Sequence, residues 1–140
     1  MLVRLLYVSR AVGPQTTYVT SSILDVARKR NPVQGITGVL FQGQGLYMQM
    51  IEGERSAVNK LFAQIMKDPR HADVEILSFS EIAKRTMEKW SMAHVNLSDM
   101  DPMVLMKHPE FDPYSATAQG ANQMLEDFAS SGVQISTVVQ

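Results

Sequence analysis

The chain has 140 residues, 45% of them hydrophobic, which is enough to bury the core of one domain. Its 13 basic and 14 acidic residues nearly cancel, which removes the electrostatic reason to expect nucleic acid or an anionic membrane as partner. The lack of cysteine excludes disulfides, thiol catalysis and thiolate metal sites, and the three histidines lack metal-ligand spacing. Because the sequence shows neither a signal peptide nor an apolar run of about 20 residues, we expect a cytoplasmic protein.

Residues 2–9 predict a first strand with apolar residues on both faces, as in a central strand covered on both sides. A helix is predicted over residues 18–30, where apolar residues recur at helical spacing, and Asn31-Pro32 is expected to end it. The strand faces are Val3, Leu5 and Tyr7 on one side and Leu2, Leu6 and Val8, with Arg4, on the other. The helix stripe consists of Val19, Ile23, Val26 and Ala27.

Residues 35–53 predict two strands joined at Gly43-Gln44-Gly45. The second of these strands carries a glutamine, Gln49, between apolar neighbours. A buried amide without hydrogen-bond partners costs about 1–3 kcal/mol, so something must bond to it. The candidates are the backbone, water, the hydroxyl of Tyr7, and a bound molecule with polar edges.

A second helix is predicted over residues 56–67, a fourth strand over 74–82 and a fifth over 90–97. The order strand, helix, strand, strand, helix, strand is the ferredoxin-like βαββαβ pattern of the α+β class, here with an additional fifth strand. Right-handed crossovers place both helices on one face of the sheet. The groove between these helices is therefore a natural ligand site.

Residues 98–140 are predicted to form a C-terminal helical extension of the same domain. A short helical piece is expected over residues 103–108 and a longer helix over residues 117–130. We expect this extension to pack on the sheet face opposite the other helices. The residues of the longer helix that are expected to face inward are Met124, Leu125 and Phe128.

Three places carry candidate site residues, each with a purely structural alternative. If the first and third strands are neighbours, Tyr7 and Gln49 can touch, either as a buried polar pair that fixes strand register or as part of a ligand site. Asn31 either stops the first helix or points its amide into the mouth of the groove. Residues 68–71 occupy the comparable end of the second helix and would otherwise be a solvated turn.

Trp90 and Met92 are expected to begin the fifth strand, where they are most simply core residues. We find no nucleophile–base pair, no paired carboxylates in one motif and no glycine-rich phosphate loop, so we do not expect an enzyme. The tetrapeptide Val33-Gln34-Gly35-Ile36 resembles the phosphate loop of acylphosphatases, but it follows a helix rather than the first strand and lacks the following arginine. A small ferredoxin-like ligand-binding protein or an acylphosphatase-like hydrolase is the alternative function.

Taken in order, the motifs resemble those of the BLUF domains, which are sensors of blue light using FAD. The resemblance covers residues 1–97, which we expect to form the flavin-binding domain. It departs from the family pattern at Tyr47-Met48, often two phenylalanines in relatives, and at Ala27, where several relatives carry a hydroxyl. The matching segments are residues 5–9, Asn31 with 35–40, 49–53, 68–71 and 90–92.

The resemblance implies FAD, replaceable by FMN or riboflavin, bound non-covalently between the two helices. It implies that Tyr7 gives the photoexcited flavin an electron and then a proton. The Gln49 amide then rearranges by rotation or tautomerisation, leaving a small red shift until dark recovery. Asn31 would bond to the polar edge of the ring, and Trp90 and Met92 would relay the signal. The other cofactor-binding positions that the resemblance implies are Arg30, Asp68, Arg70 and His71.

The resemblance also bears on how the protein passes on its signal. Its tail is similar to that of short BLUF proteins, which carry no output domain of their own. We therefore expect a photoreceptor that signals in trans. BLUF domains are often coupled to cyclic-nucleotide or cyclic-di-GMP enzymes, so an enzyme of that kind is the expected partner. We also expect the chain to form a homo-oligomer.

Overall fold

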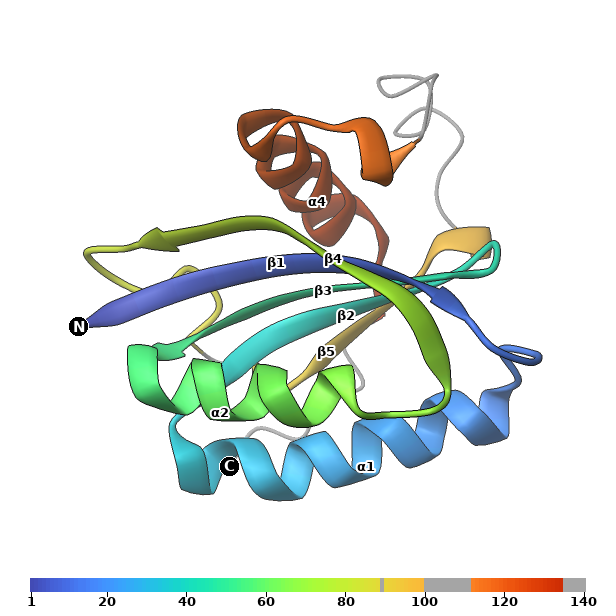
Figure 1. Cartoon of the computed structure of the whole chain (residues 1–140), viewed down its shortest axis with the longest axis horizontal. Helices are drawn as coiled ribbons and strands as arrows, with labels where there is room; N and C mark the ends of the chain where they lie inside the picture. Colours follow the sequence, from blue (N-terminus) through green and yellow to red (C-terminus); the bar gives the residue numbers. More distant parts are fainter. Residues whose placement is uncertain (89, 100–111, 135–140) are drawn as a thin grey trace.

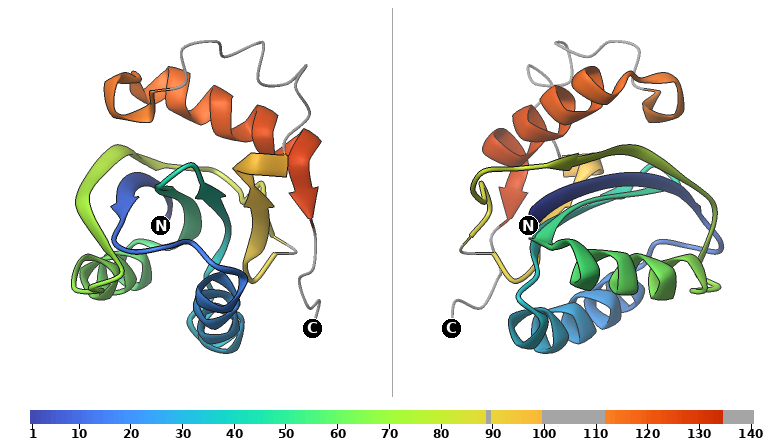
Figure 2. Two further views of the ribbon diagram at one scale, coloured as in Figure 1. Left: turned by 90° about the vertical axis from the view of Figure 1, so that its right-hand side faces the viewer. Right: turned by 60° about the vertical axis from the view of Figure 1, so that its left-hand side comes forward.

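The structure is a computed structural model that describes residues 1–88, 90–99 and 112–134. The short helix predicted over residues 103–108 lies outside this range. Helices α1 (Thr17–Gln34) and α2 (Arg55–Met66) lie below one face of a twisted sheet, and α4 (Ala118–Gly132) lies on the other face (Figures 1 and 2). This three-layer arrangement confirms the ferredoxin-like α+β fold with a C-terminal helix on the opposite face. No helix in the described ranges is long and apolar enough to cross a membrane.

The strand order of the sheet is β4-β1-β3-β2-β5-β6. The first four strands are antiparallel to their neighbours, β5 runs parallel to β2, and β6 pairs antiparallel with β5. The predicted additional strand therefore lies beside β2, on the side away from β1. The strands are β1 (Leu2–Ala11), β2 (Thr37–Gly43), β3 (Leu46–Glu54), β4 (His71–Glu81), β5 (Ala93–Asn96) and β6 (Val133–Gln134).

The turn between β2 and β3 sets the register of the central strands. Gln44 and Gly45 both have positive φ, 55° and 78°, as a two-residue type I′ hairpin requires. With this turn, Gln49 on β3 stands opposite Leu40 on β2 and opposite Tyr7 on β1. The hairpin prediction is confirmed, and it places the glutamine in the middle of the sheet.

Both faces of β1 are buried, as predicted for a central strand. Leu6 and Val8 belong to a core that α4 covers with Leu125 and Phe128. The opposite face belongs to a second core under α1 and α2, which contains Val3, Leu5, Tyr7, Leu24, Val58 and Leu61.

The end of α1 differs from the prediction, because the helix continues through Asn31-Pro32 to Gln34. Gly35 ends it in the left-handed conformation, with its N–H pointing at the carbonyls of Asn31 and Pro32. Pro32 lies in the last turn, where a missing N–H removes a single helical hydrogen bond, so the glycine is the effective stop signal. The N–H of Ile36 also bonds to Asn31. In the tetrapeptide Val33-Gln34-Gly35-Ile36, which resembles the acylphosphatase loop, the backbone N–H groups of Gly35 and Ile36 therefore cap the helix.

The predicted stripe of α1 is wrong at Val26, which is 57% exposed. The helix packs on the sheet through Leu24 and Ala27 instead.

The fifth strand is shorter than predicted, since β5 begins at Ala93 and leaves Trp90 and Met92 in the preceding loop. The carbonyls of this loop accept hydrogen bonds that are not part of the regular pairing between strands. The Trp90 carbonyl accepts from the Gly38 N–H, and the Met92 carbonyl accepts from the Arg28 side chain.

Candidate functional site: a cleft between α1 and α2

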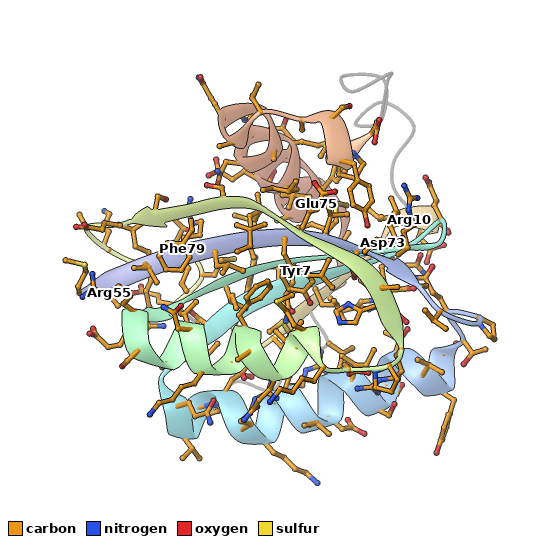
Figure 3. All side chains as sticks on the ribbon, in the orientation of Figure 1. Tyr7, Arg10, Arg55, Asp73, Glu75 and Phe79 are labelled. Atoms are coloured by element: carbon orange, nitrogen blue, oxygen red, sulfur yellow. The ribbon has the colours of Figure 1, made fainter. Side chains whose placement is uncertain are left out.

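A hydrogen bond between Tyr7 and Gln49 forms the floor of a cleft between α1 and α2. The Tyr7 hydroxyl donates to Gln49 Oε1 at 2.6 Å, and both side chains are buried. The strands place them together, because Tyr7 and Gln49 are directly paired across β1 and β3. Figure 3 shows Tyr7 projecting from β1 toward the two helices. The contact that the sequence suggested is therefore present.

The environment of Tyr7 keeps its phenol protonated. Burial is the main cause that raises the pKa of Tyr7 far above its ordinary value, and the negative charge of Asp68 raises it further. The phenol is thus a hydrogen-bond donor throughout the physiological range. Because it donates, it fixes the carbonyl end of the Gln49 amide toward β1.

The other end of the Gln49 amide meets a much weaker partner. Gln49 Nε2 lies 3.4 Å from the sulfur of Met92. A primary amide nitrogen carries two N–H donors, whereas a thioether sulfur is a weak acceptor. Gln49 is only 5% exposed, so the cleft holds a buried amide with donor capacity that the described residues leave unused.

Asn31 supplies a second buried amide at the end of α1. Its Nδ2 donates to the carbonyl of Ser91 at 2.6 Å, and its Oδ1 accepts from Arg30 Nε at 3.3 Å. The side chain is fully buried, so the helix-stop alternative does not account for it. Asn31 ties the α1 terminus to the loop that carries Met92.

The outer part of the cleft is built by the turn between α2 and β4. The guanidinium of Arg70 bonds to the carboxylate of Asp68, at 2.6 Å in the shortest contact, and reaches Ser22 on α1 at 3.4 Å. The hydrogen bond from Arg70 is the main cause that lowers the pKa of Asp68. This turn therefore spans the cleft from one helix to the other and is not simply a solvated turn.

His71 is oriented by two hydrogen bonds of different kinds. Its Nε2 lies 2.6 Å from the carbonyl of Ile65, which can only accept, so Nε2 must carry the proton. Its Nδ1 lies 2.7 Å from the hydroxyl of Ser9. The ring meets that of Tyr7 edge-on, with centroids 6.2 Å apart. His71, at the start of β4, thus packs against the ring of Tyr7.

The structure brings most of the predicted site residues to this cleft. Tyr7, Arg30, Gln49, Asp68, Arg70 and His71 line it. Asn31 and Met92 join it through hydrogen bonds to Arg30 and Gln49. Trp90 does not, because it packs against the core on the opposite face of the sheet. Met92 and Trp90 therefore face the two different cores.

Several lining residues were not singled out in the sequence as part of a site. Tyr47 lies on the same face as Gln49, which strand parity had indicated. The apolar walls are Ile23, Val26, Leu40 and Ile65. In the sequence, these aliphatic residues cannot be told apart from residues that simply pack in the core. The exposure of Val26 is explained here, since it faces the cleft.

Comparison with known proteins identifies the family. Residues 2–93 match the BLUF family, described as sensors of blue-light using FAD. The chain belongs to this family, which confirms the resemblance in the sequence.

Relatives and solved structures agree with this assignment. Photoactivated adenylate cyclase subunit beta of Euglena gracilis is 36% identical over 92 residues, which are 65% of this chain and 11% of the relative. The chain thus spans about a tenth of that protein. The structure of "BlsA photo-activated state" aligns over 100% of both chains with a TM-score of 0.81 and 26% identity. "BlrB - a BLUF protein, dark state structure" aligns over 92% of this chain and 96% of its own, with a TM-score of 0.78 and 29% identity.

The residues of the cleft fit the family's cofactor. The isoalloxazine ring of FAD has carbonyl and ring-nitrogen atoms along one edge, and these need both donors and acceptors. The unused donor capacity of Gln49 and the buried amide of Asn31 provide such groups. The cleft is walled by aliphatic side chains, as is usual for sites that hold planar cofactors.

Proposed function

We propose that Tyr7 and Gln49 form the light switch of this blue-light photoreceptor. The observation that carries the proposal is the 2.6 Å hydrogen bond from the Tyr7 hydroxyl to Gln49 Oε1 at the floor of the cleft. The amide is held firmly at its oxygen and weakly at its nitrogen, where the partner is the sulfur of Met92. An amide held in this way can change orientation when its single strong bond is lost.

FAD, when bound, supplies the absorption of blue light and, once excited, the capacity to accept an electron and a proton. Tyr7 gives up an electron and then its hydroxyl proton. Without that proton, Tyr7 no longer donates to Gln49 Oε1, and the amide rearranges by rotation or tautomerisation. When the electron and proton return to Tyr7, the amide remains in its new arrangement until it relaxes in the dark.

The other polar residues hold and orient the cofactor in this proposal. Asn31 and Arg30 lie together near the C-terminal end of α1, where they can bond to the polar edge of the ring. The outer part of the cleft carries Asp68, Arg70 and His71. These side chains would contact the ribityl and phosphate portion of FAD. Arg70 is held by Asp68 and Ser22, and His71 is held by Ile65 and Ser9.

The route of the signal begins at Met92. This residue contacts Gln49, and the same loop carries Trp90 to the core that α4 covers. A rearranged Gln49 amide would lose or exchange its contact with Met92. We propose that the resulting movement of residues 90–92 reaches α4, so that residues 98–140 act as the responsive extension of the flavin-binding unit formed by residues 1–97.

The output is proposed to occur in trans, through an enzyme that makes or degrades a cyclic nucleotide or cyclic-di-GMP. The similar protein from Euglena gracilis is a photoactivated adenylate cyclase subunit, which supports this class of partner. A homo-oligomer is also proposed, and the exposed apolar residues Ile76 and Phe79 on the edge strand β4 offer a surface for it. Light scattering after size-exclusion chromatography measures the assembly in the dark and in the light.

The variant Gln49→Leu tests the switch and its relay together. It should bind FAD yet show no light-driven change in hydrogen exchange of α4, because leucine cannot exchange hydrogen bonds with Tyr7 or the cofactor. Gln64→Leu, at an exposed position of α2, is the matched control and should respond as the unmodified protein does. Light-driven changes in α4 that survive in Gln49→Leu would refute the relay.

A further inference from the structure

The loop that carries Trp90 and Met92 is tied back to the central strands through one buried carboxylate. The N–H of Trp90 donates to the carbonyl of Met87 at 3.0 Å, so both residues belong to one turn. The N–H of Met87 donates in turn to Glu52 Oε1 on β3 at 3.0 Å. A displacement of Trp90 therefore reaches the carboxylate of Glu52 through two hydrogen bonds.

Arg4 on β1 supplies a cation for this carboxylate. Arg4 Nε and Nη2 both donate to Glu52 Oε2, at 3.0 and 2.9 Å. Nη2 also donates to the hydroxyl of Thr86 in the loop, at 2.8 Å. The Glu52 side chain is fully buried and that of Arg4 is 13% exposed. One edge of the guanidinium is thus fixed to both β3 and the loop.

The remaining nitrogen of the same guanidinium approaches α4. Arg4 Nη1 lies 3.5 Å from Glu126 Oε2, and the Glu126 side chain is 50% exposed. A continuous series of contacts and chain segments therefore connects the Gln49 amide to α4. The series runs through Met92, Trp90, Met87, Glu52, Arg4 and Glu126.

The two ion pairs of Arg4 differ in strength. The pair with Glu52 has short hydrogen bonds and is shielded from water, whereas the pair with Glu126 is longer and half exposed. Exposed ion pairs contribute little to stability and are screened by salt. When the loop moves, Arg4 is therefore expected to stay with Glu52 and Thr86 and to leave Glu126.

A cavity between the loop and α4 gives this part of the helix room to shift. Its volume is about 170 Å³. Because the loop and the helix face each other across this space, one can move relative to the other without displacing tightly packed atoms. The lining includes Thr86, Met87 and Trp90 from the loop and Glu126, Ala129 and Ser130 from α4.

We propose that Arg4 is a positioning residue of the light signal, which holds α4 through Glu126 in the dark and releases it when the loop around Trp90 moves. This inference rests on the proposed switch at Gln49. It adds to the apolar packing of Trp90 an ionic contact that can open, and only the ionic contact is strongly weakened by salt.

The test is hydrogen exchange of the α4 amides in the FAD-loaded protein, in the dark and under blue light, for the unmodified protein and for Glu126→Gln. This variant keeps the side-chain length and leaves the buried pair of Arg4 and Glu52 intact. In the dark we expect α4 of the variant to exchange about two- to fivefold faster, the range for loss of an exposed ion pair. Light should add little to that increase.

Two further readouts separate this role from a merely structural one. The red shift of the flavin and its dark recovery should be the same in Glu126→Gln as in the unmodified protein, since the switch itself is untouched. In about 1 M salt, the difference in dark exchange between the two proteins should shrink. Glu81→Gln is the matched control, because Glu81 is exposed and stands opposite Val3, on the sheet face turned away from α4.

Two results would overturn the proposal. Equal dark exchange of α4 in Glu126→Gln and the unmodified protein would mean that Arg4 does not hold the helix. A full light-driven change in the variant would mean that the signal reaches α4 by another route. A missing red shift in the unmodified protein would instead contradict the switch at Gln49, and with it the release by light, whereas the dark comparison alone decides whether Arg4 holds α4.

Discussion

The hydroxyl of Tyr7 donates a 2.6 Å hydrogen bond to the amide oxygen of Gln49, its direct partner across β1 and β3. The amide nitrogen of the same glutamine meets only a sulfur, at 3.4 Å. An O–H···O bond of this length is strong, while a thioether is a weak acceptor. The orientation of Gln49 is therefore determined by one proton on Tyr7, which makes the pair sensitive to any chemistry that removes that proton.

Replacing Tyr7 by phenylalanine should separate flavin binding from switching. Tyr7→Phe keeps the ring that packs on Phe62 and His71 but removes the hydroxyl. We expect it to bind FAD and to show no lasting red shift after blue light. Tyr47→Phe is the matched control, because Tyr47 lines the same cleft without bonding to Gln49, and it should keep the shift. A normal red-shifted state in Tyr7→Phe would contradict the role of the tyrosine.

The stability of the protein should fall at alkaline pH partly through Tyr7. Its pKa in the folded protein is raised above the value of about 10 expected in the unfolded chain. The unfolded state therefore releases this proton first. The contribution of the phenol to stability is complete below pH ~10 and is lost as the pH rises above it, by up to about 1.4 kcal/mol per pH unit.

Urea unfolding of the unmodified protein and of Tyr7→Phe between pH 8 and 11 measures this effect. The free energy of unfolding of Tyr7→Phe should decline less steeply with pH. Equal slopes for the two proteins would mean that Tyr7 ionises in the folded state as readily as in the unfolded one.

Asn31 should contribute to cofactor affinity. Asn31→Ala removes a buried amide that bonds to the Ser91 carbonyl and to Arg30, and it leaves that carbonyl without its donor. We expect at least tenfold weaker FAD binding in a fluorescence titration. Asn59→Ala, on the exposed side of α2, should bind FAD normally. Unchanged affinity in Asn31→Ala would assign Asn31 a structural role only.

Glu52 should be a major source of stability, since its carboxylate is fully buried and fully bonded. It accepts from Arg4 at 2.9 Å, from both backbone and hydroxyl of Thr86, and from the N–H of Met87. Glu52→Gln turns an amide N–H toward these donors. We expect a loss of about 3–5 kcal/mol in the free energy of unfolding, as for other broken buried ion pairs.

A second glutamate, two residues further along the chain, provides the control for this substitution. Glu54 is exposed and pairs with the N-terminal amine, so Glu54→Gln should unfold at nearly the same urea concentration as the unmodified protein. If Glu52→Gln were equally stable, the buried network would have rearranged around the amide.

The sequence predicted the fold well wherever local patterns determine it. The apolar run along β1, the Gln44-Gly45 turn and the apolar stripe of α4 each specify a local element, and the structure has all three. The Tyr7–Gln49 contact followed from strand parity together with the ferredoxin-like order. The end of α1 was predicted wrongly because a proline in the last turn costs a helix little, whereas Gly35 supplies the left-handed cap.

The separation of Trp90 from Met92 could not be predicted from spacing. Residues two apart on a strand share one face, but these two lie in a loop whose carbonyls bond to Gly38, Asn31 and Arg28. Such side-chain and cross-strand bonds depend on the assembled tertiary structure.

The visible spectrum of the purified, FAD-loaded protein, recorded in the dark and after blue light, tests the central claim most directly. The Tyr7–Gln49 switch predicts a flavin spectrum that shifts slightly to the red on illumination and returns in the dark. A flavin spectrum that light leaves unchanged, or a protein that takes up no FAD, would contradict it.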